Sequence, residues 1–157
     1  MTTTNAMRLL MKANIPVDTS EYTVDESDLS GVHAAHELGI DPDVMFKTLV
    51  CRGDKKGLSV FCIPVAEELD LKKCAAVTGD KKIEMIHVRE LLGLTGYIRG
   101  GCSPIGMKKA YPTWIDETAQ LCDRIYVSAG MRGQQIIVAP DALKDFIGAQ
   151  YADLTKR

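Results

Sequence analysis

A lysine lies within the apolar run of residues 45–51, where strand-forming side chains predominate. In an extended strand Lys47 shares a face with Met45, Leu49 and Cys51, because alternate residues point to the same side. Two interpretations are open for this lysine. Either its ammonium group reaches water at the entrance of the strand, or it is held in a pocket to meet a phosphate or a carboxylate.

A second candidate is the glycine-rich segment of residues 95–106, which contains four glycines and Pro104. Such a segment permits close backbone approach and can aim N–H groups at an anion or a developing oxyanion, although an ordinary structural turn has the same composition. It is not a serine-hydrolase elbow, because the spacing is G-x-S-x-x-G and the proline after Ser103 has no N–H. We therefore do not expect Ser103 to be a nucleophile.

No group of side chains has the spacing of a metal site. His33 and His36 occur in the order H-x-x-H-E, which differs from the H-E-x-x-H zinc pattern, so a partly buried histidine is the expectation. The five cysteines are odd in number and include no C-x-x-C pair, which favours reduced thiols that pack as small hydrophobes. The sequence predicts no metal and no cofactor.

The charge is unevenly distributed along the chain. The net charge is −2, but residues 47–109 contain twelve basic and seven acidic side chains and carry about +5. Solvated lysines on helix faces explain this, and so does a limited contact with a polyanion. Under the second interpretation, Lys108 and Lys109 would follow a nucleic-acid backbone just after the glycine-rich segment.

Length and composition indicate one globular domain over residues 1–157, since 46% of the residues are apolar and 25% are charged. A chain of this size buries roughly 70% of its unfolded surface and needs no disulfide to fold. The first residues lack the basic start, apolar run and cleavage site of a signal peptide, and no stretch reaches the length of a membrane helix. We expect a soluble cytoplasmic protein without membrane contact.

Helix and strand signals alternate along the chain and predict an α+β fold with a curved, largely antiparallel sheet. Helices are expected at 5–13, 32–38, 70–77, 87–92 and 140–147, with a proline-opened turn at Asp41-Pro42. Thr4 and Asp70 are the expected N-caps and Pro140 the expected opening residue, and the last four helices are expected to end before Gly39, Gly79, Gly93 and Gly148. Strands are expected at 17–24, 45–51, 58–63, 124–128 and 134–139, where the second and third, and the fourth and fifth, form hairpins.

Five segments in their order along the chain resemble the YbaK family of free-standing aminoacyl-tRNA editing proteins, which is related to the editing domain inserted in bacterial prolyl-tRNA synthetases. The segments are residues 44–50, 69–73, 81–85, 95–109 and 125–133. Together and in this order they are specific, whereas any one alone is not. The blocks Lys-Lys-Ile-Glu-Met at 81–85 and Gly-Gly-Cys-Ser-Pro-Ile-Gly at 100–106 most resemble the subgroup that deacylates Cys-tRNA(Pro).

The resemblance implies a curved, mixed, barrel-like sheet with flanking helices, no metal, and cleavage of the ester to the terminal adenosine. It implies a catalytic role for Lys47 by motif position. One departure is Gln135, at a position two residues after the Arg-Gly turn where related sequences can carry an acid, and this leaves any carboxylate role at the position open. The implied substrate-binding residues are Tyr22, Gly100, Gly101, Ser103, Pro104, Gly106 and Ser128.

In that subgroup the substrate's own thiol attacks its carbonyl and expels the tRNA, leaving a cyclic thioester, so the enzyme needs no nucleophile and acts as a hydrolase or a lyase. Lys47 would hold a phosphate or the terminal ribose, and N–H groups of residues 100–106 would meet the carbonyl oxygen. The implied substrate is Cys-tRNA(Pro), with Cys-tRNA(Cys) as a second one. The implied partners are aminoacylated tRNA(Pro) and prolyl-tRNA synthetase, and no contact with DNA is implied.

Three alternatives accompany this expectation. The same fold would act on Ala-, Ser- or Thr-tRNA if an external water were the nucleophile. The chain would otherwise be a non-catalytic module that binds tRNA or a synthetase. A small-molecule hydrolase is disfavoured, because the sequence offers no candidate nucleophile.

Overall fold

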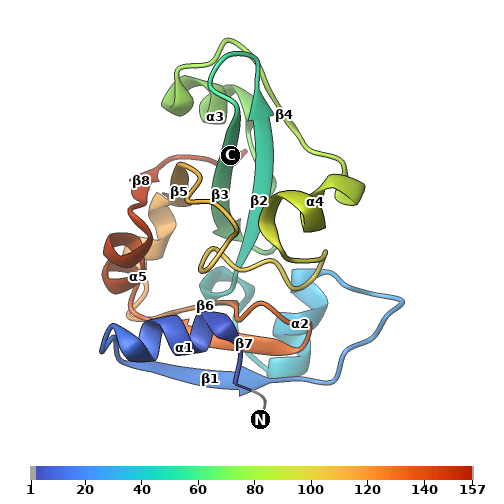
Figure 1. Ribbon diagram of the computed structural model, residues 1–157. Helices are drawn as coiled ribbons and strands as arrows, with labels where there is room; N and C mark the ends of the chain where they lie inside the picture. The colour runs from blue at the N-terminus through green and yellow to red at the C-terminus, as the bar shows by residue number, and fades with distance from the viewer. Residues whose placement is uncertain (1–2, 157) are drawn as a thin grey trace.

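The structure is a computed structural model and describes residues 3–156 (Figure 1). Residues 1, 2 and 157 of the expected domain lie outside the described residues, including the beginning of the segment searched for a signal peptide. The helices are α1 (Asn5–Lys12), α2 (Gly31–Leu38), α3 (Leu71–Thr78), α4 (Val88–Thr95) and α5 (Pro140–Ile147), with 3-10 turns η1 (Pro42–Val44) and η2 (Glu117–Leu121). The strands are β1 (Val17–Glu21), β2 (Phe46–Gly53), β3 (Leu58–Pro64), β4 (Ile83–Met85), β5 (Thr113–Asp116), β6 (Ile125–Ser128), β7 (Gln134–Val138) and β8 (Gln150–Ala152).

The strands form two sheets. One has three antiparallel strands in the order β1-β7-β6, and the other has five in the order β4-β2-β3-β5-β8. The pairs β3–β5 and β5–β8 are parallel, so the larger sheet is mixed. The predicted α+β class with a mixed sheet and flanking helices is confirmed, but the barrel-like curvature needs correction. The sheets do not close into a barrel. A parallel bridge between Met45, the residue before β2, and Tyr126 on β6 links them.

The predicted caps explain most helix ends. Thr4 accepts a hydrogen bond from the N–H of Met7 and forms a capping box at the start of α1, and Asp70 caps α3. The end predicted for α4 was wrong. The helix continues through Gly93 and ends at Gly96, whose φ of +87° suits a glycine cap, because an interior glycine costs a helix only about 1 kcal/mol.

Three short strands, β4, β5 and β8, were not predicted. Each has three or four residues, and the parallel pairing of β5 brings together residues such as Phe61 and Trp114 that are far apart in the sequence. Local periodicity carries little information about such strands. The rings of Phe61 and Trp114 stack with centroids 5.6 Å apart, which adds packing between β3 and β5.

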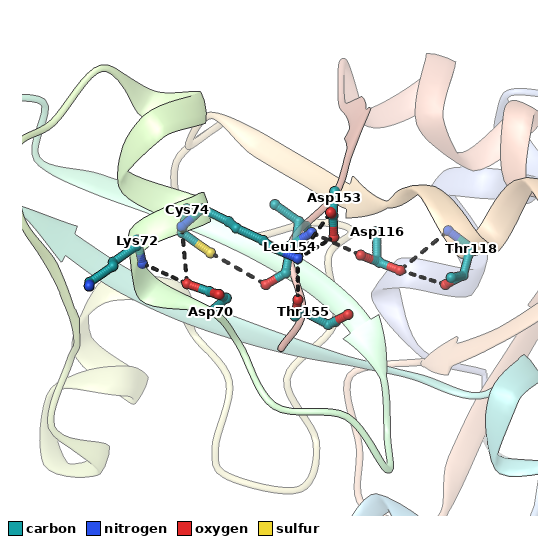
Figure 2. A network of polar contacts seen from close by, with 9 residues as sticks. Asp70, Lys72, Cys74, Asp116, Thr118, Asp153, Leu154 and Thr155 are labelled. Atoms are coloured by element: carbon teal, nitrogen blue, oxygen red, sulfur yellow. Dashed lines mark hydrogen bonds and ion pairs between the residues drawn. The ribbon is translucent and has the colours of Figure 1, made fainter. Parts of the chain in front are cut away.

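A polar network fixes the C-terminal segment (Figure 2). The carboxylate of Asp116 is fully buried and accepts hydrogen bonds from the N–H of Leu154, at 3.0 Å, and from Thr118. Lys73 on α3 forms an ion pair with Asp153 at 3.0 Å and donates to the carbonyl of Thr155. The network therefore ties the chain end to α3 and to the turn after β5.

Two main clusters of buried side chains form the core. α1 packs Ala6, Met7 and Leu10 against β6 and β7 of the smaller sheet, and α5 adds Leu143 to this cluster. The second cluster lies between α3 and the larger sheet and includes Phe61. The start of β2, the end of β6 and the glycine-rich segment contribute to the first cluster through Phe46, Val127 and Ile105, and neighbouring residues of the same segments line a cavity. No helix among residues 3–156 is long and apolar enough to cross a membrane.

Candidate functional site

A cavity of about 570 Å³ lies between the first half of β2, the helices α2 and α4, and the ends of β6 and β7. Most of its wall is apolar, and a few polar groups interrupt it, which is the usual character of a small-molecule site. The volume falls within the range that accommodates a nucleoside or an amino acid ester. The polar side chains on its wall include Tyr22, Ser30, Lys47, Thr48, Arg99, Ser128 and Gln135.

Lys47 is the second residue of β2 and pairs with Ile63 on β3. It is half-buried and lines the cavity, as do Met45 and Leu49, which were expected on its face of the strand. Cys51, expected on the same face, does not line the cavity and is buried in the second core cluster. Burial lowers the pKa of Lys47 below its usual value, and Glu68 and Glu67 oppose this by attraction. Lys47 forms no ion pair with any described residue, so its charge is available to an anion in the cavity.

Ser128 and Gln135 also line the cavity and lie across from each other on β6 and β7. The hydroxyl of Ser128 accepts a hydrogen bond from the N–H of Gly130 at 3.2 Å. The Oε1 atom of Gln135 is buried and has no hydrogen-bond partner within residues 3–156. A buried acceptor without a partner costs free energy, and a donor on a bound ligand would remove that cost.

Tyr22 follows β1 and lines the same cavity. Its N–H donates to the carbonyl of Gly133 at 3.0 Å, which fixes the chain beside the turn between β6 and β7. Burial raises the pKa of Tyr22 above its usual value, and a backbone hydrogen bond from Gly133 partly opposes this. The phenol is therefore neutral at physiological pH and can both donate and accept a hydrogen bond.

The glycine-rich segment contributes Gly100 and Cys102 to the wall, whereas Gly101 faces away from the cavity. A Cβ at Gly101 would lie 3.0 Å from the backbone N of Arg132 and 3.2 Å from the carbonyl carbon of Met131. Only glycine permits this approach without a shift of the backbone. The N–H groups of Gly100 and Cys102 donate to no described residue, so they are available to an oxyanion.

The remaining residues expected in the site belong to the glycine-rich segment and stabilise its conformation without lining the cavity. Ser103 is fully buried, and its hydroxyl accepts a hydrogen bond from the N–H of Ile105 at 3.2 Å. Pro104 is buried, and Gly106 packs near the hydroxyl of Tyr97, which donates to the carbonyl of Ile105. Of the predicted site residues, Lys47, Tyr22, Gly100 and Ser128 line the cavity, and Gly101, Ser103, Pro104 and Gly106 do not.

Sequence reasoning missed the apolar walls. α2 and the loop before it supply Leu29, Gly31 and Ala34, while β4, α4 and the loop between them supply Met85, Ile86, Val88 and Leu91. These residues form no motif, and only tertiary packing brings the two helices to the same cavity. Arg99 had a local signal, since it directly precedes the glycine pair of the loop.

The described residues that line the cavity include no activated nucleophile and no cluster of metal ligands. The described part of the chain contains no group of three or more His, Cys, Asp or Glu side chains that could hold a metal ion. The five cysteines are free thiols, and burial raises the pKa of Cys102, which lines the cavity, to about 12. A thiol with such a pKa is neutral at pH 7 and is a poor nucleophile. The arrangement can instead bind, orient and polarise a ligand.

Comparisons with known proteins agree on one family. The aminoacyl-tRNA editing domain family matches residues 29–146. EbsC of Enterococcus faecalis, named as a candidate Cys-tRNA(Pro)/Cys-tRNA(Cys) deacylase, is 48% identical over 154 residues, which cover 98% of this chain and 94% of that protein. A proline–tRNA ligase of Shouchella clausii is 32% identical over 133 residues, which cover 84% of this chain but 22% of the ligase. The crystal structure of a candidate trans-editing enzyme for prolyl-tRNA synthetase has a TM-score of 0.82 at 25% identity and covers 97% of this chain and 93% of its own.

Proposed function

The chain belongs to the aminoacyl-tRNA editing domain family, and from this membership we propose that it is a deacylase that cleaves cysteine from Cys-tRNA(Pro). The observation that carries the proposal is the 48% identity to EbsC over nearly the full length of both chains. Cys-tRNA(Cys) is a second substrate on the same ground. Residues 1–157 act as a single editing domain in this proposal.

The substrate's thiol is the attacking group in the proposed reaction. Its sulfur bonds to the ester carbonyl carbon, the bond from that carbon to the ribose oxygen breaks, and the thiol proton ends on that oxygen. The products are tRNA and a cyclic thioester, which water opens to cysteine. The absence of an activated nucleophile among the described lining residues supports this assignment, because an enzyme of this kind accelerates the step by orientation and charge alone.

The polar groups of the cavity have separate roles in this proposal. Lys47 holds a phosphate or the terminal ribose, for which its unpaired and half-buried ammonium group is suited. The N–H groups of Gly100 and Cys102 meet the carbonyl oxygen as it gains negative charge. The unpartnered Oε1 of Gln135 accepts a hydrogen bond from the α-ammonium group of cysteine.

A panel of charged tRNAs tests the proposal. Single-turnover deacylation is measured with Cys-, Ala-, Ser- and Thr-tRNA(Pro) at equal enzyme concentration. We expect cleavage of the cysteinyl ester to exceed the others by orders of magnitude. Faster cleavage of Ala- or Ser-tRNA(Pro) would instead assign the fold to another amino acid with water as nucleophile, and no cleavage of any ester would indicate a binding module.

Prolyl-tRNA synthetase is the proposed partner, since the chain matches a segment of a proline–tRNA ligase. An editing protein that reads little of the tRNA would depend on the synthetase to select it. Addition of prolyl-tRNA synthetase should therefore raise the rate on Cys-tRNA(Pro) more than on Cys-tRNA(Cys), and equal effects would remove the synthetase as the source of selection.

A further inference from the structure

The turn between β2 and β3 and the connection between α3 and β4 lie side by side at the end of the molecule farthest from β1 (Figure 1). Each segment carries two consecutive lysines, and all four side chains are exposed. We call these four residues the lysine tip: Lys55, Lys56, Lys81 and Lys82.

Two aspartates clamp the tip through the backbone. Asp54 in the turn accepts hydrogen bonds from the N–H groups of both lysines of the α3–β4 connection, at 3.2 and 3.4 Å. Asp80 accepts from the N–H groups of both lysines of the turn, at 3.0 and 2.8 Å. A Cβ at Gly53 would lie 2.0 Å from Oδ2 of Asp80, so glycine is required for this approach. The clamp is reciprocal and holds the two segments in one arrangement.

The four ammonium groups are left without partners. Both aspartates are used by backbone N–H groups, and the tip lysines form no ion pair with any of residues 3–156. Six other Lys and Arg side chains have acidic partners, namely Arg52, Lys73, Arg124, Arg132, Lys144 and Lys156, whereas others such as Lys72, Arg89 and Lys109 form no ion pair within residues 3–156. The tip differs from these in placing four unpaired lysines on two segments that are fixed to each other. A rigid pair of segments that presents unpaired ammonium groups is suited to binding a phosphate backbone. Each phosphate that a lysine neutralises releases condensed counterions, which favours binding.

We propose that the lysine tip binds the sugar-phosphate backbone of the RNA whose aminoacylated 3′ end occupies the cavity. The proposal rests on the proposed function and adds a second contact to it. β2 connects the cavity to the lysine tip. Lys47 near its start lines the cavity, and Gly53 at its end precedes the turn that carries Lys55 and Lys56. At roughly 3.3 Å per residue these points are about 20 Å apart, so the tip meets nucleotides well away from the ester.

The chemistry of the contact determines what it contributes. A lysine ammonium group meets phosphate as a point charge and reads no base, so the tip adds affinity without selecting a sequence. It should therefore act on tRNA(Pro) and tRNA(Cys) alike. The loss of four such contacts should lower the slope of log affinity against log salt concentration by about 3.

The test replaces all four tip lysines by glutamine. The clamp uses only backbone N–H groups of these residues, so the fold should remain. A matched control removes four positive charges elsewhere, with glutamine at Arg8, Lys12, Arg124 and Lys144. Binding of uncharged tRNA is measured by fluorescence anisotropy over a series of salt concentrations, and kcat/KM is measured on Cys-tRNA and on a cysteinyl ester of the trinucleotide CCA.

We expect the tip variant to bind uncharged tRNA at least about 10-fold more weakly than the control near 0.1 M salt, with a reduced salt slope. Its kcat/KM should fall on Cys-tRNA and stay unchanged on the trinucleotide ester, which is too short to reach the tip. Unchanged tRNA binding and salt slope would overturn the proposal, as would an equal loss on both substrates.

The failure of the proposed function would be seen separately. If the wild-type protein cleaves neither ester, the deacylase assignment falls, while binding of uncharged tRNA still decides the role of the tip. If the fourfold variant does not fold, the double variants at Lys55 and Lys56 and at Lys81 and Lys82 take its place. Each pair should then lower the salt slope by about half as much, and pairs with no effect would contradict the contact.

Discussion

The Nε–H group of Arg132 donates a hydrogen bond of 2.8 Å to the carbonyl oxygen of Arg99, the residue before Gly100. The same guanidinium forms an ion pair with Glu26 at 2.9 Å. Arg132 thus joins the turn between β6 and β7 to the glycine-rich segment and to the loop that follows β1. The position of the N–H groups at Gly100 and Cys102 depends on this connection.

Replacing Arg132 by Gln should therefore slow the reaction without removing any group that touches the substrate. We expect kcat to fall by roughly 10-fold with little change in KM, because a glutamine cannot hold both partners and a small displacement of oxyanion donors is costly. The control is Glu26→Gln, which removes only an exposed ion pair worth at most about 1 kcal/mol. Equal rates for wild type and Arg132→Gln would show that the segment holds its position alone.

Lys47→Ala should abolish deacylation and leave the fold intact. The side chain is half-buried on the cavity wall and has no ion-pair partner among the described residues, so its removal breaks no internal bond. Lys47→Arg should also be poor, because a planar guanidinium does not replace a compact ammonium group in a shaped pocket. Circular dichroism checks the fold and single-turnover kinetics check the rate. Wild-type activity in a folded Lys47→Ala protein would remove this residue from the site.

Cys102→Ala should preserve most of the turnover, although Cys102 lines the cavity. Burial raises the pKa of its thiol to about 12, so almost no thiolate exists at pH 7 to attack an ester. The alkylation rate of the protein by iodoacetamide at pH 7 should accordingly be far below that of free cysteine. A loss of several orders of magnitude in kcat for Cys102→Ala would make this thiol the nucleophile.

Gln135→Leu should separate stability from activity. The buried Oε1 atom has no partner among the described residues, so an apolar replacement of similar size should keep or raise the free energy of unfolding. If Oε1 of Gln135 accepts a hydrogen bond from the α-ammonium group of the substrate, kcat/KM should fall by about 10- to 100-fold. Urea unfolding and single-turnover kinetics measure the two effects.

A matched control for that variant is Gln134→Leu. Gln134 also has a buried oxygen without a hydrogen-bond partner among residues 3–156, but its amide nitrogen donates to Glu21 and the residue does not line the cavity. We expect this change to destabilise the protein slightly and to leave kcat/KM unaltered. Parallel losses of stability and activity in both variants would mean that Gln135 has only a structural role.

Local sequence signals predicted those helices whose ends are set by residues of their own first turn. The caps at Thr4 and Asp70 and the opening proline at 140 all coincide with observed helix ends. Each cap accepts hydrogen bonds from N–H groups of its own first turn, and the proline lacks the N–H that would be unpaired at this position. The strands β5 and β8 were missed, since parallel pairing depends on partners distant in the sequence. The separation of the strands into two sheets was missed for the same reason.

The site was predictable to a similar extent. The apolar neighbours of Lys47 suggested a pocket, and the glycines suggested close backbone approach, but neither signal distinguished Gly100 on the cavity wall from Gly101 against Arg132. That distinction depends on the β6–β7 turn, which lies about thirty residues further along the chain. The unpartnered oxygen of Gln135 likewise appears only when β6 and β7 are paired.

The last prediction concerns the side chain of the substrate. It follows from a cavity that Ser103 does not line, since this residue is fully buried, and in which the Cys102 thiol is neutral. If the substrate thiol attacks, tRNA(Pro) charged with 2-aminobutyrate, which has a methyl group in place of the thiol, should bind but hardly react. Shape cannot produce such a difference, because a hydrophobic pocket separates near-isosteres by only about 1–3 kcal/mol.

The measurement is single-turnover deacylation of Cys-tRNA(Pro) and 2-aminobutyryl-tRNA(Pro) at saturating and equal enzyme concentrations, with competition between the two to compare their affinities. We expect similar affinities and a rate on the thiol-free ester that is lower by more than the roughly 200-fold that such pocket discrimination can supply. Comparable rates would mean that a water held in the cavity attacks the ester. Because the orienting groups Lys47 and Gln135 are common to both substrates, a loss confined to the thiol-free ester assigns the attack to sulfur.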